Sequence, residues 1–139
     1  DDDLYAPVYL ASLLSYLTLN ESTAGKPKGI KLASWFTFET ADGTLGLCQP
    51  RAESWPVEWI YGYGFSYLYR SECALEHPFR DENIGEDFHF FSELRSSYGA
   101  NCIELMSDSS GICLHIQHAG NTSNCFATLE VVKGTVSEL

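Results

Sequence analysis

The chain has 139 residues, of which 45% are hydrophobic and 14% aromatic, a composition that predicts one folded domain over residues 1–139 and excludes disorder. Nineteen acidic residues against eight basic ones give a formal net charge of −11. Such a surface repels phosphate backbones and anionic lipids, and no apolar run is long enough for a membrane span, so we expect no nucleic-acid partner and no transmembrane segment.

Residues 7–18 are the segment with clear helical periodicity. Apolar side chains recur there at intervals of three and four, namely Tyr9, Leu10, Leu13, Leu14 and Leu17. Such spacing places them on one stripe of a helix. Pro7 suits the first turn, where a missing N–H costs nothing. We predict a helix over 7–18, with a strand as the alternative, and then a polar loop over 20–29.

Residues 30–40 alternate as a strand would. One face would carry Ile30, Leu32, Phe36 and Phe38, and the other Lys31, Trp35, Thr37 and Glu39. Asp42-Gly43 is a strong hairpin turn, so residues 44–48 are predicted to return as the next strand. Two prolines make residues 49–56 a loop.

The stretch 57–69 concentrates the most aromatic area in the chain. Read as a strand, it places an unbroken row of rings on one face and small residues, including Gly62 and Gly64, on the other. The rings would serve either as core or as a binding platform, because exposed Trp and Tyr are common in interaction hot spots. The predicted binding residues are Trp55, Trp59, Tyr63, Phe65, Tyr67 and Tyr69.

The second half of the chain reads as loops and short strands. We expect a solvated acidic loop within 71–85, strands over 87–95, 101–106, 111–118 and 125–132, and a hairpin loop at 107–111. In the strand 111–118, we expect Ile112, Leu114 and Ile116 to face inward and Cys113, His115 and Gln117 outward. About seven short strands predict an all-β fold, an antiparallel β-sandwich or small β-barrel with one N-terminal helix.

The cysteines bear on the compartment. Five of them, Cys48, Cys73, Cys102, Cys113 and Cys125, suit two disulfide bridges and one free thiol, with a Cys102–Cys113 or Cys113–Cys125 bridge as a candidate. Asn20 and Asn121 begin glycosylation sequons. The missing initiator Met is what a processed chain would show. The cysteine count and the sequons, together with the high Tyr and Trp content and a single Met, favour a secreted protein; the alternative is a cytosolic protein with five reduced, mostly buried thiols.

No residue pattern carries a catalytic or metal signature. Cys113, His115, His118 and Cys125 match no zinc-site spacing, and the acidic run 81–87 lacks the ligand pattern of a calcium loop. We therefore assign no catalytic residue, no metal and no cofactor. His89 and His115 are the residues to substitute if the protein proves to be a hydrolase.

Part of the chain resembles a known family. Residues 29–38 and the following 40–48, ending at Cys48, look like the second and third strands of the Alternaria-allergen-like secreted fungal β-barrels. Cys73, the aromatic residues 87–91 and Cys125 fall in similar places. The resemblance covers about a third of the chain and implies a small, secreted, disulfide-bridged barrel of the effector type. The early helix and the odd cysteine depart from that pattern.

We predict a secreted, disulfide-stabilised binding protein, an effector or virulence protein that docks a host protein or glycan. The alternative is a cytosolic acidic immunity or inhibitor protein whose segment 81–87 caps a basic toxin or enzyme. A small hydrolase is the third hypothesis.

Overall fold

The structure is a computed structural model. It describes residues 3–20, 26–50, 55–56, 58–122, 125 and 129–131, with backbone only for residues 58 and 59. The strands are β1 (Leu4–Tyr5), β2 (Gly29–Glu39), β3 (Thr44–Cys48), β4 (Tyr67–Tyr69), β5 (Ile103–Ser107), β6 (Cys113–Gln117) and β7 (Leu129–Glu130). The helices are α1 (Tyr9–Asn20), α2 (Glu58–Tyr61), α3 (Ser71–Glu76) and α4 (Glu86–Tyr98).

Strand β2 is the centre of the sheet, because four strands pair with it. Its first half lies between antiparallel β4 and parallel β5. Its second half lies between antiparallel β3 and parallel β6. β1 and β7 extend the sheet beyond β6 and β3. The fold is built on a β-sheet, as predicted, but the sheet is mixed and not purely antiparallel, and the described residues form α2, α3 and α4 besides the predicted N-terminal helix.

A register shift divides β2 between Leu32 and Ser34, where the pairing with β5 is irregular. An extra residue in a strand reverses which side chains face the core. Ile30 and Leu32 therefore pack in the same hydrophobic cluster as Trp35. Strict alternation had placed Trp35 on the opposite face, and that prediction is wrong.

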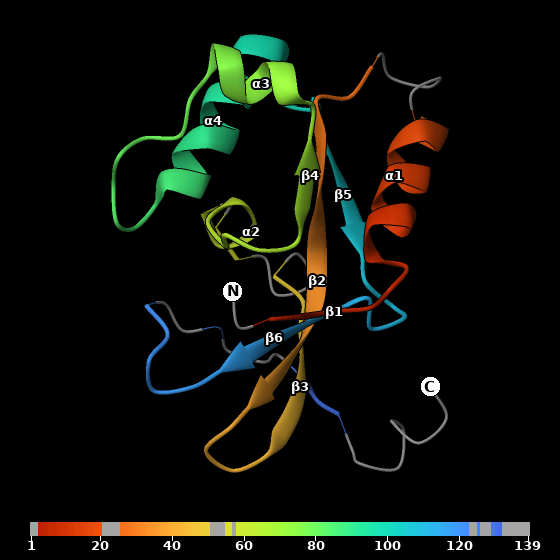
Figure 1. Ribbon diagram of the computed structural model, residues 1–139, viewed down its shortest axis with the longest axis vertical. Coiled ribbons are helices and arrows are strands. Elements are labelled where there is room, and N and C mark those ends of the chain that lie inside the picture. The colour runs from red at the N-terminus through yellow and green to blue at the C-terminus, as the bar shows by residue number, and fades with distance from the viewer. Residues whose placement is uncertain are drawn as a thin grey trace.

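The sheet carries helices on both sides (Figure 1). α1 lies on one side of β2, and α2, α3 and α4 lie on the other. Each side has its own hydrophobic cluster. The first cluster includes Tyr9, Leu13, Leu17, Ile30, Leu32, Trp35, Cys48, Tyr63, Phe65, Ile112, Cys113 and Cys125. The second includes Ile60, Tyr61, Cys73, Phe90, Phe91, Leu94, Cys102 and Ile103.

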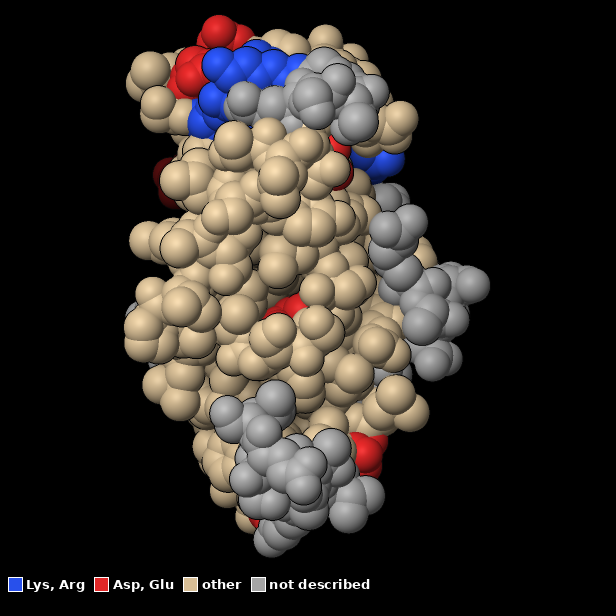
Figure 2. Space-filling view, turned by 90° about the vertical axis from the view of Figure 1, so that its right-hand side faces the viewer, with Lys and Arg blue, Asp and Glu red and all other residues tan. Residues whose placement is uncertain are grey.

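The predicted N-terminal helix is confirmed as α1, displaced by two residues from 7–18. Only Tyr9, Leu13 and Leu17 of the predicted stripe are buried, while Leu10 and Leu14 are exposed. The helix contains no charged residue. Figure 2 shows that the face on this side of the molecule is mostly uncharged, with Lys and Arg side chains gathered at one end.

The hairpin between β2 and β3 is also confirmed. Gly43 has a φ of 75°, a conformation that glycine adopts readily. The N–H of Thr44 donates to Asp42 Oδ1 at 2.9 Å. Half of the loop predicted at 49–56 and half of the last strand predicted at 125–132 lie outside the described residues. Within the second range, β7 pairs with β3.

The aromatic stretch 57–69 is not one strand, contrary to the prediction. It forms helix α2, an irregular segment over 62–66, and the short strand β4. Gly62 and Gly64 weaken strand pairing because they add no side-chain packing. Ser66 has a φ of 70°, which no strand residue adopts. The aromatic rings of this stretch therefore do not form a single ladder.

Residues 87–95 are helical, not extended, because they belong to α4. Phe90, Phe91 and Leu94 are buried together with Asp87, and their spacing of three and four is that of a helix. Glu86 and Asp87 lie in the first turn and Arg95 in the last. The acidic side chains stabilise the positive N-terminal end of the helix dipole, and Arg95 stabilises its negative C-terminal end.

The strands predicted at 101–106 and 111–118 exist as β5 and β6, but they do not form a hairpin. Both run parallel to β2 and follow one another along it. In β6, Cys113, His115 and Gln117 are buried, while Leu114 and Ile116 are partly exposed. The predicted orientation is therefore reversed within β6, which joins β2 after the register shift, whereas Ile112, just before β6, is buried as predicted.

Asp108 organises the connection between β5 and β6. Its side chain is buried, and Oδ1 accepts hydrogen bonds from the N–H groups of Ser110, Gly111 and Ile112 at 2.8–3.1 Å. Oδ2 accepts from the N–H of Cys113 at 3.1 Å. One carboxylate thus satisfies four backbone donors that no strand partner reaches.

We expect Asp108→Ala to lower the free energy of unfolding by about 2–4 kcal/mol, because it leaves buried donors without an acceptor. Asp42→Ala is the matched control. It removes a carboxylate from an exposed turn with a single such bond, and we expect a loss of at most about 1 kcal/mol. Urea unfolding measures both; equal losses would contradict the role given to Asp108.

Candidate functional site

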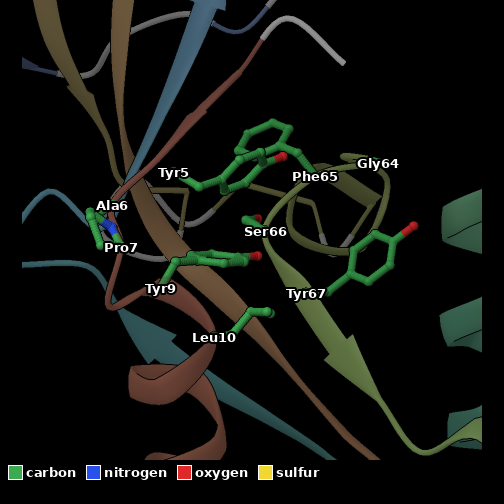
Figure 3. A pocket seen from close by; sticks show the side chains of 9 residues that line it. All are labelled: Tyr5, Ala6, Pro7, Tyr9, Leu10, Gly64, Phe65, Ser66 and Tyr67. Atoms are coloured by element: carbon green, nitrogen blue, oxygen red, sulfur yellow. The ribbon is translucent and has the colours of Figure 1, made fainter.

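An open pocket of about 470 Å³ lies between the start of α1 and the segment that leads into β4. We call it the tyrosine pocket. It is lined by Tyr5, Ala6, Pro7, Tyr9, Leu10, Gly64, Phe65, Ser66 and Tyr67. Figure 3 shows Tyr5 and Tyr9 pointing from the first segment toward the second, with Ser66 between them. Its volume is in the range of small-molecule sites.

Ser66 is the unusual residue of the tyrosine pocket. Its φ of 70° is left-handed, and it is the one described residue other than glycine with a positive φ. Its Oγ is buried and has no hydrogen-bond partner. Both features cost free energy, and such strain concentrates at functional sites. Ser66 lines the tyrosine pocket, so a rotation of its side chain would bring Oγ to a ligand hydroxyl there.

The tyrosines present neutral hydroxyls. Burial raises the pKa of both Tyr5 and Tyr9, so both stay protonated over the whole physiological range. Their rings lie 4.7 Å apart. No lining residue is charged. The tyrosine pocket therefore suits an uncharged ligand that offers an apolar face and hydroxyl groups.

A buried polar cluster lies behind the wall of the pocket. Lys31 is fully buried, and its Nζ donates to the carbonyl oxygens of Tyr63 at 2.5 Å and Phe65 at 3.0 Å. The same Nζ lies 5.1 Å from the centroid of the Tyr67 ring. Tyr67 turns its hydroxyl away from the pocket and donates to Asp87 Oδ1 at 2.9 Å (Figure 3).

Burial shifts the ionisation of this cluster. It lowers the pKa of Lys31 to about 7, although the Asp87 carboxylate opposes the shift. Burial likewise raises the pKa of Asp87 above its usual range, against the hydrogen bond from Tyr67. Desolvation disfavours the charged form of each group. Burial therefore acts against the charge on both groups.

A second polar network connects β6 to the N-terminal residues. His115 Nδ1 lies 2.7 Å from Asp3 Oδ1, and His115 Nε2 lies 2.5 Å from Gln117 Nε2. The N–H of Cys125 donates to Gln117 Oε1 at 3.1 Å. Because both nitrogens of the buried His115 ring are engaged, it offers no free position for acid–base catalysis.

The predicted binding residues are separated in the structure. Phe65 and Tyr67 line the tyrosine pocket. Tyr63 is core, with its ring centroid 5.0 Å from that of the buried Trp35.

The other predicted binding residues lie elsewhere. Tyr69 packs in the second cluster, 4.9 Å from Phe90 between ring centroids. Trp55 packs against the first cluster. The side chain of Trp59 lies outside the described residues, so no shared mouth of Trp55 and Trp59 is defined.

Sequence reasoning missed Tyr5, Tyr9 and Ser66 as pocket residues. Tyr5 precedes the predicted helix, Tyr9 lies within it, and Ser66 lies in the predicted aromatic strand. It also missed the pairing of Lys31 with the pocket wall. The available signal was a lysine in the middle of the apolar run 30–36, since a charge there is buried if the strand is central.

All five cysteines are free and buried. In the sequons, Asn20 Nδ2 donates to the carbonyl of Tyr16, and Asn121 Nδ2 donates to that of Ile116. Among the described residues, no group of three or more His, Cys, Asp or Glu could hold a metal ion. No described helix is long and apolar enough to cross a membrane.

The acidic segment 81–87 is divided between solvent and core. Asp87 is buried, and Glu82 lies 3.9 Å from Arg80 and 3.5 Å from the ring of His89. Part of its charge is therefore already balanced within the protein.

No family model, curated protein or solved structure matches this chain. The roles of its residues are therefore argued from their own geometry.

Lys31 predicts a pH dependence of stability. Between pH 7 and 10.5 the unfolded chain holds a proton on this lysine that the folded protein has lost. Stability therefore rises with pH in this window, with a slope of up to about 1.4 kcal/mol per pH unit. Lys31→Met, which removes the ionisable group, should have a flatter profile.

Urea unfolding of both proteins from pH 7 to 9.5 tests this, and the difference between the two slopes isolates Lys31 from the cysteines. Parallel profiles would show that the lysine keeps its proton in the fold.

Proposed function

We propose that this protein binds a neutral saccharide in the tyrosine pocket and does not catalyse a reaction. The observation that carries the proposal is the buried, unpartnered hydroxyl of Ser66 beside the Tyr5 and Tyr9 rings in an uncharged pocket. Aromatic faces carry negative charge density and attract the polarised C–H groups of a sugar ring. The hydroxyl groups give orientation.

An acidic or phosphorylated ligand fits less well. The tyrosine pocket offers no cation, and Lys31 is fully buried, with its Nζ bonded to two carbonyls behind the wall. With a net charge of −11, the protein also repels anions at long range.

The tyrosine pocket makes a prediction that separates binding from folding. Ser66→Gly should raise the free energy of unfolding by about 1 kcal/mol, because glycine adopts a φ of 70° without strain. The same substitution should weaken saccharide binding by about 3- to 10-fold, because it removes one hydrogen bond. Tyr9→Phe should weaken binding to a similar extent while its ring stays in place.

The measurement is a printed array of neutral and acidic oligosaccharides, followed by calorimetric titration of the best neutral one. Tyr98→Phe, whose hydroxyl bonds Glu76 outside the pocket, is the matched control and should bind as the wild type. Binding that is confined to acidic saccharides, is absent, or is indifferent to Ser66→Gly and Tyr9→Phe would contradict the proposal.

For the biological setting we propose a secreted effector or virulence protein that acts on a host glycan, supported by the five cysteines and two sequons. A specific observation favours the alternative of a cytosolic acidic inhibitor: all five thiols are unpaired and buried, as in a reducing compartment.

Thiol labelling of the protein from its native source distinguishes the two settings. A secreted protein should label fewer than five thiols before reduction and five afterwards, with added mass at Asn20 or Asn121 if it is glycosylated. Labelling of all five without reduction would contradict secretion and support the cytosolic setting. Intact mass spectrometry after alkylation gives the count.

A further inference from the structure

Two cysteines that are distant in sequence meet where β3 ends. Cys48 is the last residue of β3, and its Cα lies opposite that of Trp35 on β2. The indole Nε1 of Trp35 donates to Cys125 Sγ at 3.2 Å. The thiols of Cys48 and Cys125 hydrogen-bond to each other. Both cysteines belong to the same hydrophobic cluster, and no disulfide joins them.

The surroundings lower the pKa of Cys125. Its sulfur accepts hydrogen bonds from Cys48, Trp35 and Tyr63, and these bonds lower its pKa in spite of burial. Burial and the Cys125 contact raise the pKa of Cys48. Cys125 also keeps a small exposure of 7%, whereas Cys48 has none. The two cysteines therefore differ in both ionisation and access.

We propose that Cys48 and Cys125 form a reversible redox pair, in which Cys125 is the attacking thiol and Cys48 the resolving one. The Cys125 thiolate attacks a low-molecular-weight disulfide, forms a mixed disulfide and releases one thiolate. Cys48 loses its proton to solvent and attacks the Cys125 sulfur, which releases the second thiolate. The protein loses two electrons and two protons as dithiol becomes disulfide, and the external disulfide is reduced to two thiols.

The remaining cysteines do not share this arrangement. Cys113 is fully buried, and its pKa is raised by burial. Cys73 and Cys102 both contact the backbone of Lys28. Cys73 Sγ is 3.7 Å from the carbonyl oxygen of Lys28, and the N–H of Lys28 donates to the carbonyl oxygen of Cys102. Burial raises the pKa of both thiols. None of the three has a hydrogen-bonded thiol neighbour among the contacts of the described residues.

The bridge would tie the C-terminal part of the chain to the sheet. Cys125 precedes β7, which pairs with β3 at Leu47 and Gly46, next to Cys48. A bridge that closes so long a loop restricts the unfolded chain, and we expect the thermal midpoint to rise by about 5–10 °C on oxidation.

The experiment uses the full chain, reduced and then equilibrated in mixtures of reduced and oxidised glutathione. Acid quenching, alkylation of free thiols under denaturing conditions and peptide mapping identify the products. The wild type should lose two thiols and yield one cross-linked peptide pair containing Cys48 and Cys125. Cys48→Ser should stop at a glutathione adduct on Cys125, and Cys125→Ser should form neither product.

Cys113→Ser is the matched control and should behave as the wild type. Five free thiols in the most oxidising mixture would overturn the proposal, as would a cross-link between another pair. A Cys48→Ser protein that takes up no glutathione would overturn the assignment of Cys125 as the attacking thiol.

Discussion

The register shift between Leu32 and Ser34 determines the rest of the architecture. Before it, β2 buries Ile30 and Leu32 on the side of α1 and turns Lys31 toward α4, where Phe91 lies 5.7 Å from Nζ. After it, Trp35 takes the side of α1. Even-numbered residues thus face α1 before the shift and odd-numbered residues face it afterwards, and β2 changes its partner strands at the same place. The loop held by Asp108 lies beside the register shift, between the parallel strands β5 and β6. The N–H of Asp108 donates there to Ser34 Oγ.

The shift also explains why so many polar side chains are buried. Thr37, His115 and Gln117 are buried in the second half of the sheet, and Asp3 joins them through His115. Asp3, His115 and Gln117 find partners within the network, so burial costs less than it would for isolated groups. A network of this kind fixes the position of the N-terminal residues, and β1 and the start of α1 follow directly from them.

Local signals in the sequence were enough for some elements and not for others. The helix α1 and the Asp42-Gly43 turn are decided by neighbouring residues, and both predictions are confirmed. Which side chains of β2 and β6 face the core could not be predicted from alternation. The register shift depends on pairing with β5, which is far away in the chain. α4 was misread as a strand although Asp87, Phe90, Phe91 and Leu94 have the helical spacing of three and four. The aromatic residues of α4 pack against Tyr61 and Tyr69.

The tyrosine pocket was out of reach of sequence reasoning for a similar reason. Phe65 and Tyr67 were predicted to be binding residues, but Tyr5 and Tyr9 reach them only because β1 pairs with β6 at Leu114 and Cys113. Positions of this kind follow from long-range pairing, which no local pattern in the chain reveals.

The strain at Ser66 is sustained by contacts on both sides of it. Lys31 Nζ binds the carbonyls of Tyr63 and Phe65, and the N–H of Leu32 donates to the carbonyl of Ser66 at 2.9 Å. A Cβ on Gly64 would lie 2.6 Å from Asp87 Oδ2, so only glycine lets the segment lie against that carboxylate. The buried lysine therefore does more than occupy the core. Its two hydrogen bonds hold the segment in the one conformation that leaves the Ser66 hydroxyl without a partner in the pocket, which is the preorganisation that a binding site requires.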